Sequence, residues 1–249
     1  LKSYCTTPLK LMNITEDKNS NQLHLMLMSS SPGILDGDEY SLKIEIAQNC
    51  SLQLHTQGYQ RLFNMKQGAS QQLELRMSDG SCFCYLPHPS VPHDQSAFKA
   101  VNNFYVGKGC HFVFGEILTC GRKLNNEQFL FFLYHRVSNI YVDNRLVIKE
   151  NLLMQPSLIN VHAIGQLEGY THQASMIYLQ EDADIKTIQH QLLDLLASQK
   201  NIEAGISAAP VNGLIIRLLG NGAEQLYDCL QQLNAILQTH TVNHLQYAP

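Results

Sequence analysis

Charged residues are scarce in this chain. Asp, Glu, Lys and Arg make up 15% of its 249 residues, against about 25% in an average soluble protein. A surface built from so few charges is largely neutral polar or apolar, which is typical of a protein that binds partners. The formal net charge is −4, so no excess of Lys and Arg is present to attract nucleic acid or anionic lipid. We therefore expect neither nucleic acid nor a membrane among its partners.

Long apolar runs are missing too. None approaches the ~18 residues needed to span a bilayer, and residues 1–4 carry no signal-peptide pattern. Leu1 stands where Met would begin a chain, which indicates a trimmed N-terminus. The seven cysteines have no regular spacing, and a chain of this size does not need disulfides for stability, which is typical of a reducing compartment. These features predict a cytoplasmic protein.

Apolar residues recur at every second position from residue 23 to about residue 150, which is the period of a β-strand. Clear examples are residues 23–27, 42–46 and 73–77. Turn dipeptides such as Asp79-Gly80 and Lys108-Gly109 separate the segments. Many short strands at close spacing predict a mainly β protein, and the periodicity leaves a sandwich, a barrel and a β-solenoid open.

The C-terminal part has a different pattern. Residues 184–200 place apolar side chains on one helical face behind a candidate N-cap, Asp182 or Asp184, and a second helix is predicted over about 223–237. Two strands are predicted between the helices, joined by Asn212-Gly213, a dipeptide that type I′ turns favour. We therefore expect two C-terminal α-helices flanking a β-hairpin. This α-β-β-α module, residues 181–249, is expected to pack on a β-rich body, residues 1–180, as a single structural unit.

One stretch of the chain contains residue types that bind metals. Cys82, Cys84, His88 and His93 offer two thiolates and two imidazoles, the ligands of a tetrahedral zinc site or a nickel site. A metal-dependent enzyme built on these four residues is one hypothesis. Their spacing does not match a zinc finger or knuckle, and on a strand Cys82 and Cys84 share a face with Leu86, so small buried hydrophobes are the alternative.

Motifs for other chemistry are absent from the sequence. There is no Gly-x-Ser-x-Gly elbow that would present a nucleophile, and Gly107-Lys108-Gly109 lacks the spacing of a phosphate-binding loop. Any GTP or ATP chemistry must therefore come from a partner. We expect no catalytic residues and no tightly bound cofactor.

Several short phrases follow one another in a characteristic order. They are TPLKLM at 7–12, SPGILDGD at 31–38, LHTQ at 54–57, LPHP at 86–89 and LIIRLLG at 214–220. Each phrase is weak alone, but their order over nearly the whole chain resembles the UreD (UreH) family of urease accessory proteins. Within the second phrase, Gly33 and Gly37 permit backbone angles closed to other residues, and Pro32 restricts the backbone where the turn begins.

The resemblance implies both a fold and a role. The implied fold is an elongated, β-helical, solenoid-like stack of short strands that carries a pair of C-terminal helices. The implied role is that of a non-enzymatic chaperone in nickel insertion, which binds UreF and the urease apoprotein, while UreF recruits the GTPase UreG. A water-filled path for a transient nickel ion is also implied. Carboxylates suit such a path because single oxygen ligands hold a divalent ion loosely.

The resemblance also implies candidate residues for the nickel path. They are Asp38, Glu116 and Glu150, with Glu39 as a weaker candidate. Each has a structural alternative. Asp38 would cap its turn through backbone amides, and Glu116 or Glu150 would pair with Arg122 or Arg145.

Overall fold

The computed structural model describes residues 1–17 and 22–245 of the chain. Strands account for 46% of it and helices for 15%, and the strands stack into about three solenoid turns. The predictions of a mainly β fold, a solenoid-like stack and two C-terminal helices are therefore confirmed. No helix within the described residues combines the length and apolarity needed to cross a membrane.

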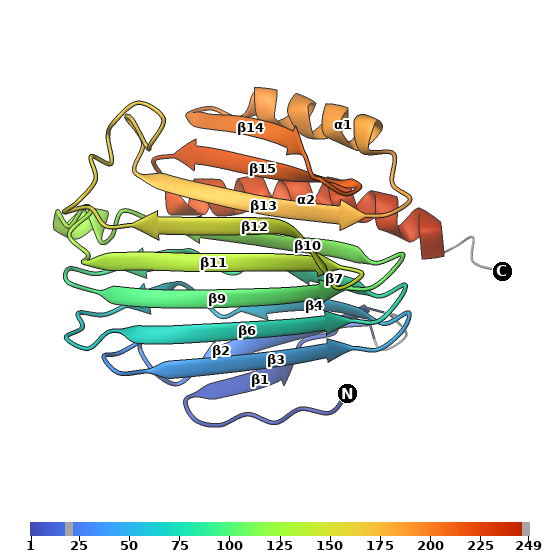
Figure 1. Cartoon of the computed structure of the whole chain (residues 1–249), viewed down its shortest axis with the longest axis horizontal. Coiled ribbons are helices and arrows are strands. Elements are labelled where there is room, and N and C mark those ends of the chain that lie inside the picture. The colour runs from blue at the N-terminus through green and yellow to red at the C-terminus, as the bar shows by residue number, and fades with distance from the viewer. Residues whose placement is uncertain (18–21, 246–249) are drawn as a thin grey trace.

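Two sheets face each other (Figure 1). The large sheet has ten strands: β1 (Leu9–Asn13), β2 (Gln22–Ser29), β4 (Ser51–Thr56), β5 (Gln60–Leu62), β7 (Cys82–Tyr85), β8 (Ser90–Pro92), β10 (His111–Leu118), β13 (His172–Gln180), β14 (Ile202–Ala208) and β15 (Gly213–Gly220). The small sheet has five: β3 (Glu39–Ile46), β6 (Ala69–Met77), β9 (Ala97–Val106), β11 (Leu133–Val142) and β12 (Arg145–Met154). The helices are η1 (Lys123–Asn125), α1 (Ile185–Ser198) and α2 (Ala223–Leu245).

The chain winds from one sheet to the other and adds strands to both in each coil. Strands β2, β4, β7 and β10 pair in parallel in the large sheet, as β3, β6, β9 and β11 do in the small sheet. The register keeps apolar residues in line from coil to coil, as in the pairs Leu42–Leu73 and Leu75–Phe104. Antiparallel strands close the stack, with β1 at one end and β13, β15 and β14 at the other.

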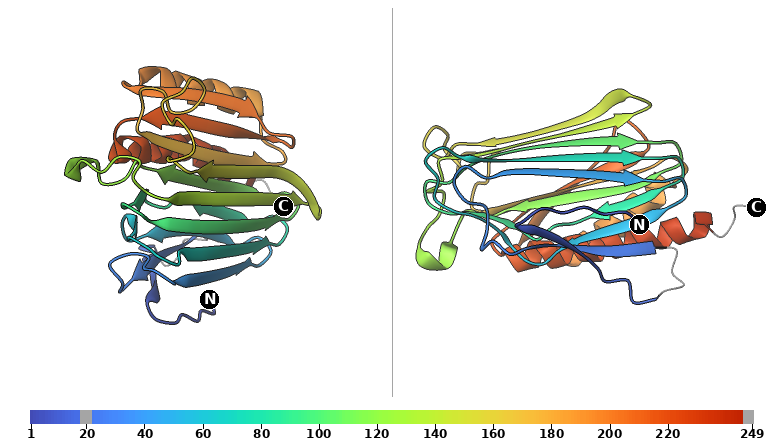
Figure 2. Two further views of the ribbon diagram at one scale, coloured as in Figure 1. Left: turned by 60° about the vertical axis from the view of Figure 1, so that its left-hand side comes forward. Right: turned by 90° about the horizontal axis from the view of Figure 1, so that it is seen from below.

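The protein has three layers, seen from below in Figure 2. Alternate residues of each strand point between the sheets, where Leu75, Phe104 and Phe112 are fully buried. The opposite residues of β10, β13 and β15 form a second core with the helices, in which Val113, Ile216 and Leu230 are fully buried. The helices therefore cover the outer face of the large sheet, while no helix of the described part of the chain covers the outer face of the small sheet.

The C-terminal elements agree with the predicted helix-hairpin-helix order. Asp184 caps α1, since its carboxylate accepts a hydrogen bond from the backbone N of Thr187. Helix α2 continues to Leu245, beyond the predicted end near residue 237. The hairpin extends the large sheet through β13, and residues 246–249 of the predicted module lie outside the described part of the chain.

The predicted type I′ turn at Asn212-Gly213 is wrong. Such a turn requires positive φ at both residues, and neither residue has it. The Asn212 side-chain amide instead donates to the backbone oxygens of Gln180, Glu181 and Ala183 at 2.8–3.0 Å. Glycine is needed at 213 because a Cβ there would lie 2.2 Å from the backbone oxygen of Tyr178. The dipeptide therefore docks the hairpin against the end of β13.

Candidate functional site: a polar cavity between the sheets

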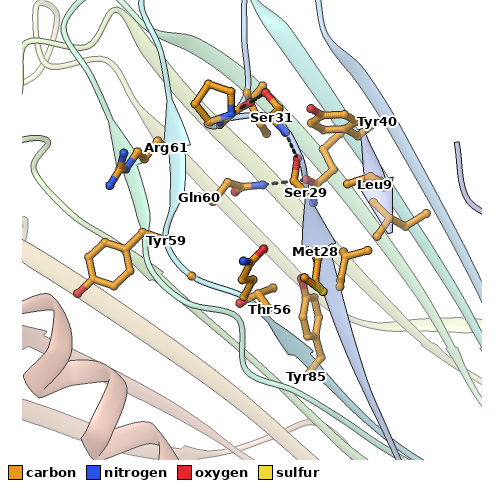
Figure 3. Close-up of a pocket in the computed structure, with 18 residues that line it drawn as sticks. Leu9, Met28, Ser29, Ser31, Tyr40, Thr56, Tyr59, Gln60, Arg61 and Tyr85 are labelled. Atoms are coloured by element: carbon orange, nitrogen blue, oxygen red, sulfur yellow. Dashed lines mark hydrogen bonds between the residues drawn. The ribbon is translucent and has the colours of Figure 1, made fainter. Parts of the chain in front are cut away.

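The main cavity has a volume of about 540 Å³ and lies in the first coils of the solenoid. It is lined by the ends of β2 and β4, by the turn at residues 31–34, and by the segment 57–61. Figure 3 shows Ser31, Tyr40, Thr56 and Gln60 around it. Its lining is mixed, since apolar side chains such as Leu9, Met28 and Ile34 lie beside hydroxyl and amide groups and the guanidinium of Arg61. The polar groups can hydrogen-bond water and small polar species.

A second cavity of about 50 Å³ lies next to the first and deeper in the stack. Both are lined by Thr56, Gly58, Gln60, Gln71 and Tyr85. The Gln60 amide donates to the oxygen of Gln71 at 2.9 Å, so these shared groups are held in place. Together the two cavities lead from the exposed turn towards the polar interior of the solenoid.

A buried ion pair lies at the inner end of this polar region. Arg136 of β11 contacts Glu116 of β10, and their side chains are only 8% and 12% exposed. The pair bridges the two sheets, and Arg136 lines the inner cavity. Burial is the largest single effect and lowers the pKa of Arg136, but the charge and hydrogen bond of Glu116, together with Tyr134 and Tyr85, raise this pKa overall. The guanidinium also lies 3.4 Å from the hydroxyl of Ser90.

Arg136 and its polar neighbours were not predicted from the sequence, although the residue pattern of β11 indicates them. Along β11 the buried positions alternate through Tyr134, Arg136, Ser138 and Ile140. An arginine and a serine therefore occupy inward positions of an otherwise apolar series. The amide of Asn102, which is also buried, donates to the hydroxyl of Ser138 at 2.9 Å. Polar residues at inward strand positions were the feature that would have located this site.

The predicted path residues do not come together at one point. Glu116 lies inside the stack, whereas Glu39 is exposed at the start of β3. Asp38 is half-buried, and its Oδ2 accepts hydrogen bonds from the backbone N of Leu35 at 2.8 Å and from the hydroxyl of Tyr40 at 3.2 Å. Because Tyr40 lines the main cavity, Asp38 lies one side chain away from it.

The ion-pair partners expected from the sequence are wrong. Glu116 pairs with Arg136, and Glu150 of β12 pairs with Arg217 of β15 at 2.6 Å. The proposed partner Arg122 instead binds Glu127. Arg122 and Arg145 lie near the glutamates along the chain, but the coiled fold brings more distant strands beside them.

The turn at residues 31–38 is held by close packing and by Asp36. Gly37 has φ of +81°, as predicted, but Gly33 does not have positive φ. Gly33 is needed for space, because a Cβ there would lie 2.4 Å from the backbone oxygen of Arg61. Asp36 Oδ1 accepts hydrogen bonds from the backbone N of residues 66, 67 and 68 at 2.8–3.0 Å. These bonds, above all that of Gln67, lower the pKa of Asp36.

The four Cys and His candidates for a metal centre are not gathered. Cys84 is buried against α2, where its thiol lies 3.4 Å from Asn234 Oδ1, and burial raises its pKa to about 12. His88 stacks on Tyr227, whereas His93 packs on Phe63. Within the described residues, no three His, Cys, Asp or Glu side chains are placed to hold a metal ion. The hypothesis of an enzyme with a Cys/His centre therefore has no site in this structure.

The fold and the site define a β-solenoid with one helix-covered face and a polar region within an otherwise apolar interior. The sequence profile of the UreD urease accessory protein family matches residues 1–249. A urease accessory protein UreD from Flavobacterium johnsoniae is 44% identical over 232 residues, which cover 93% of this chain and 84% of that protein. The proteins of the same name from Acetivibrio thermocellus and Haemophilus influenzae are 32% and 33% identical, over 94% and 95% of this chain and 90% and 92% of theirs.

The chain therefore belongs to the UreD family of urease accessory proteins. As an accessory protein, it has a role in the maturation of urease.

Proposed function

We propose that this chain is a nickel-insertion scaffold that binds UreF and the urease apoprotein. UreF in turn recruits the GTPase UreG, and a nickel ion passes through the interior of the solenoid on its way to urease. The observation that carries the proposal is a pair of adjacent cavities between the sheets that lead from an exposed turn to Arg136, the ion-pair partner of the buried Glu116. The chain that contains them belongs to a urease accessory family.

The surface supports a role in assembly. Apolar side chains are exposed in two neighbouring loops at one end of the long axis of the molecule, where β10 and β12 end. Leu124, Leu158 and Ile164 in these loops are 100%, 74% and 96% exposed. Phe129 and His162 join these loops through an edge-to-face ring contact of 5.6 Å. Neighbouring exposed apolar groups favour binding to another protein. We place a partner surface at this end of the molecule.

The oxygen ligands in and beside the cavities support passage of an ion: hydroxyl and amide groups line them, and the carboxylates of Asp38 and Glu116 contact lining residues. Hydroxyl, amide and carboxylate oxygens bind a divalent ion more loosely than a complete set of imidazoles or thiolates does. Asp38 would act near the outer end of the path, and Glu116 at its inner end. Glu150 and Glu39 remain candidates for the surfaces where the ion enters or leaves. The ion is cargo here, so we expect only weak and substoichiometric nickel in the isolated protein.

Assembly is tested by co-purification. The chain should be retained by tagged UreF, and the pair should then retain UreG and the urease apoprotein. Replacing Leu124 and Ile164 by Asp should weaken one of these associations. The matched control is Leu153→Asp, because Leu153 is 50% exposed but lies on β12. Failure of the unaltered chain to bind UreF would overturn the scaffold proposal.

The path is tested by urease activation in the assembled complex. Asp38→Ala should lower nickel-dependent activation while the complex still forms. Glu45→Ala is the control, because Glu45 is an exposed carboxylate on β3, outside the cavity lining. If the complex with Asp38→Ala activates urease as well as the complex with the unaltered chain does, Asp38 is not part of the path.

A further inference from the structure

Two histidines meet on the outer face of the large sheet. His24 of β2 and His55 of β4 lie on neighbouring parallel strands, and both alternate with leucines that pack in the core between the sheets. Their facing nitrogens, Nδ1 of His24 and Nε2 of His55, are 3.3 Å apart. The ring planes differ by only 16°. Both side chains are half-buried, so solvent reaches the pair.

The separation of these nitrogens suits a bound metal ion. Two metal–nitrogen bonds of about 2.0–2.1 Å at a tetrahedral angle place the nitrogens about 3.3–3.4 Å apart. Without metal, one ring donates its N–H to the other. For both rings to bind a metal, the proton of the donating nitrogen moves to the second nitrogen of the same imidazole. Both facing nitrogens then present lone pairs, and no proton leaves the protein.

The surroundings keep the pair ready to bind. Burial, with smaller contributions from His24 and His88, lowers the pKa of His55. Met26, two residues beyond His24 on β2, is the register partner of His55, so its thioether lies on the same face by strand alternation. Gln53, the register partner of His24, contacts Gln238 of α2. The pair therefore lies beside the end of that helix.

We propose that His24 and His55 form a two-imidazole site for a borderline divalent transition-metal ion, of the class of Ni²⁺, Cu²⁺ or Zn²⁺. Imidazole suits all three ions, and two protein ligands leave the other positions to water or to a group from a partner. Such a site holds its ion weakly and exchanges it readily. It lies outside the cavity described above and does not depend on the proposed nickel path.

The test is equilibrium dialysis of the full-length chain, without a histidine tag, against NiSO₄ and separately against ZnSO₄. Loss of even an outer-shell partner of a metal ligand weakens binding about 10–100-fold. We therefore expect His24→Gln and His55→Gln each to weaken binding at least ~10-fold, and the double variant to lose little more. His135→Gln is the control, because His135 lies on the small sheet and its Nε2 bonds to Asn151 at 2.9 Å.

Affinities of both variants equal to that of the unaltered chain would overturn the site. If the variants do not fold, X-ray absorption spectroscopy of the unaltered chain with one equivalent of Ni²⁺ decides. Scattering from two imidazoles supports the site, and a shell of oxygen or sulfur alone overturns it. Neither measurement contains urease or the GTPase, so failure of the proposed function would leave the result unchanged.

Discussion

The ion pair between Glu116 and Arg136 offers the sharpest test of how stability and function are related here. The change is Glu116→Gln, which removes the charge but keeps an oxygen that can accept a hydrogen bond. Arg136 then keeps its charge inside the stack, where its side chain is 8% exposed. Its Nε has no hydrogen-bond partner among the described residues, and the other contacts of the guanidinium, with the Ser90 hydroxyl and the Tyr134 ring, are with uncharged groups.

The size of the effect follows from this burial. Removing one partner of a buried pair costs about 3–5 kcal/mol, because the remaining charge is uncompensated. Glutamine can still accept a hydrogen bond, so we expect Glu116→Gln to lose about 3 kcal/mol of stability, the lower end of this range. Glu116→Ala keeps no such bond and should lose about 5 kcal/mol, the upper end. The free energy of unfolding of a chain this long should fall by about 3 kcal/mol per molar urea, so a loss of about 3 kcal/mol lowers the urea concentration at the unfolding midpoint by about 1 M.

The double variant Glu116→Gln with Arg136→Met separates the two roles of Glu116. Replacing both members of a buried pair by uncharged groups is often neutral, so the double variant should recover most of the lost stability. If the carboxylate takes part in nickel passage, as we propose, this stable variant still fails to activate urease. Urea unfolding and urease activation are measured on the same preparations.

Two results would refute the reasoning. Unfolding of Glu116→Gln at the same urea concentration as the unaltered chain would show that the pair is not needed for stability. Full urease activation by the stable double variant would remove Glu116 from the nickel path and leave it a structural role.

Two further predictions concern stability. Burial lowers the pKa of His111 to about 4, so the unfolded chain binds a proton more readily than the folded chain, and stability should be lost as pH falls from about 6.5 to 4. Thermal unfolding at pH 7.5 and 5 tests this, and a flat profile contradicts it. Leu230→Ala should cost about 2–5 kcal/mol because Leu230 is fully buried on the inner face of α2. Leu193→Ala, at a 45% exposed position, should change stability by at most about 0.5 kcal/mol.

Local patterns predicted the elements of the fold well. The two-residue period located β2, β3 and β6, because a strand that buries one face needs an apolar residue at every second position. The helical period and the Asp184 cap located α1 for the same kind of reason. Choosing the solenoid over a sandwich or a barrel required the family resemblance, since all three folds have the same period within each strand.

The identity of contacting residues could not be predicted in this way. Glu116 meets Arg136 because β10 and β11 lie in opposite sheets, and Glu150 meets Arg217 across 67 residues of chain. The prediction of a type I′ turn at residues 212–213 was wrong for a related reason. Asn212 and Gly213 were interpreted through their own backbone preferences, whereas contacts with β13 decide their conformation.

The sequence by itself therefore determined the period, the helices and the family of this protein, because these depend on residues close together in the chain or on the order of its motifs. Only the tertiary structure decided where the polar cavity lies, which carboxylate is buried, and that His24 faces His55. These features depend on how the coils are stacked, and the stacking brings together side chains that no local pattern connects.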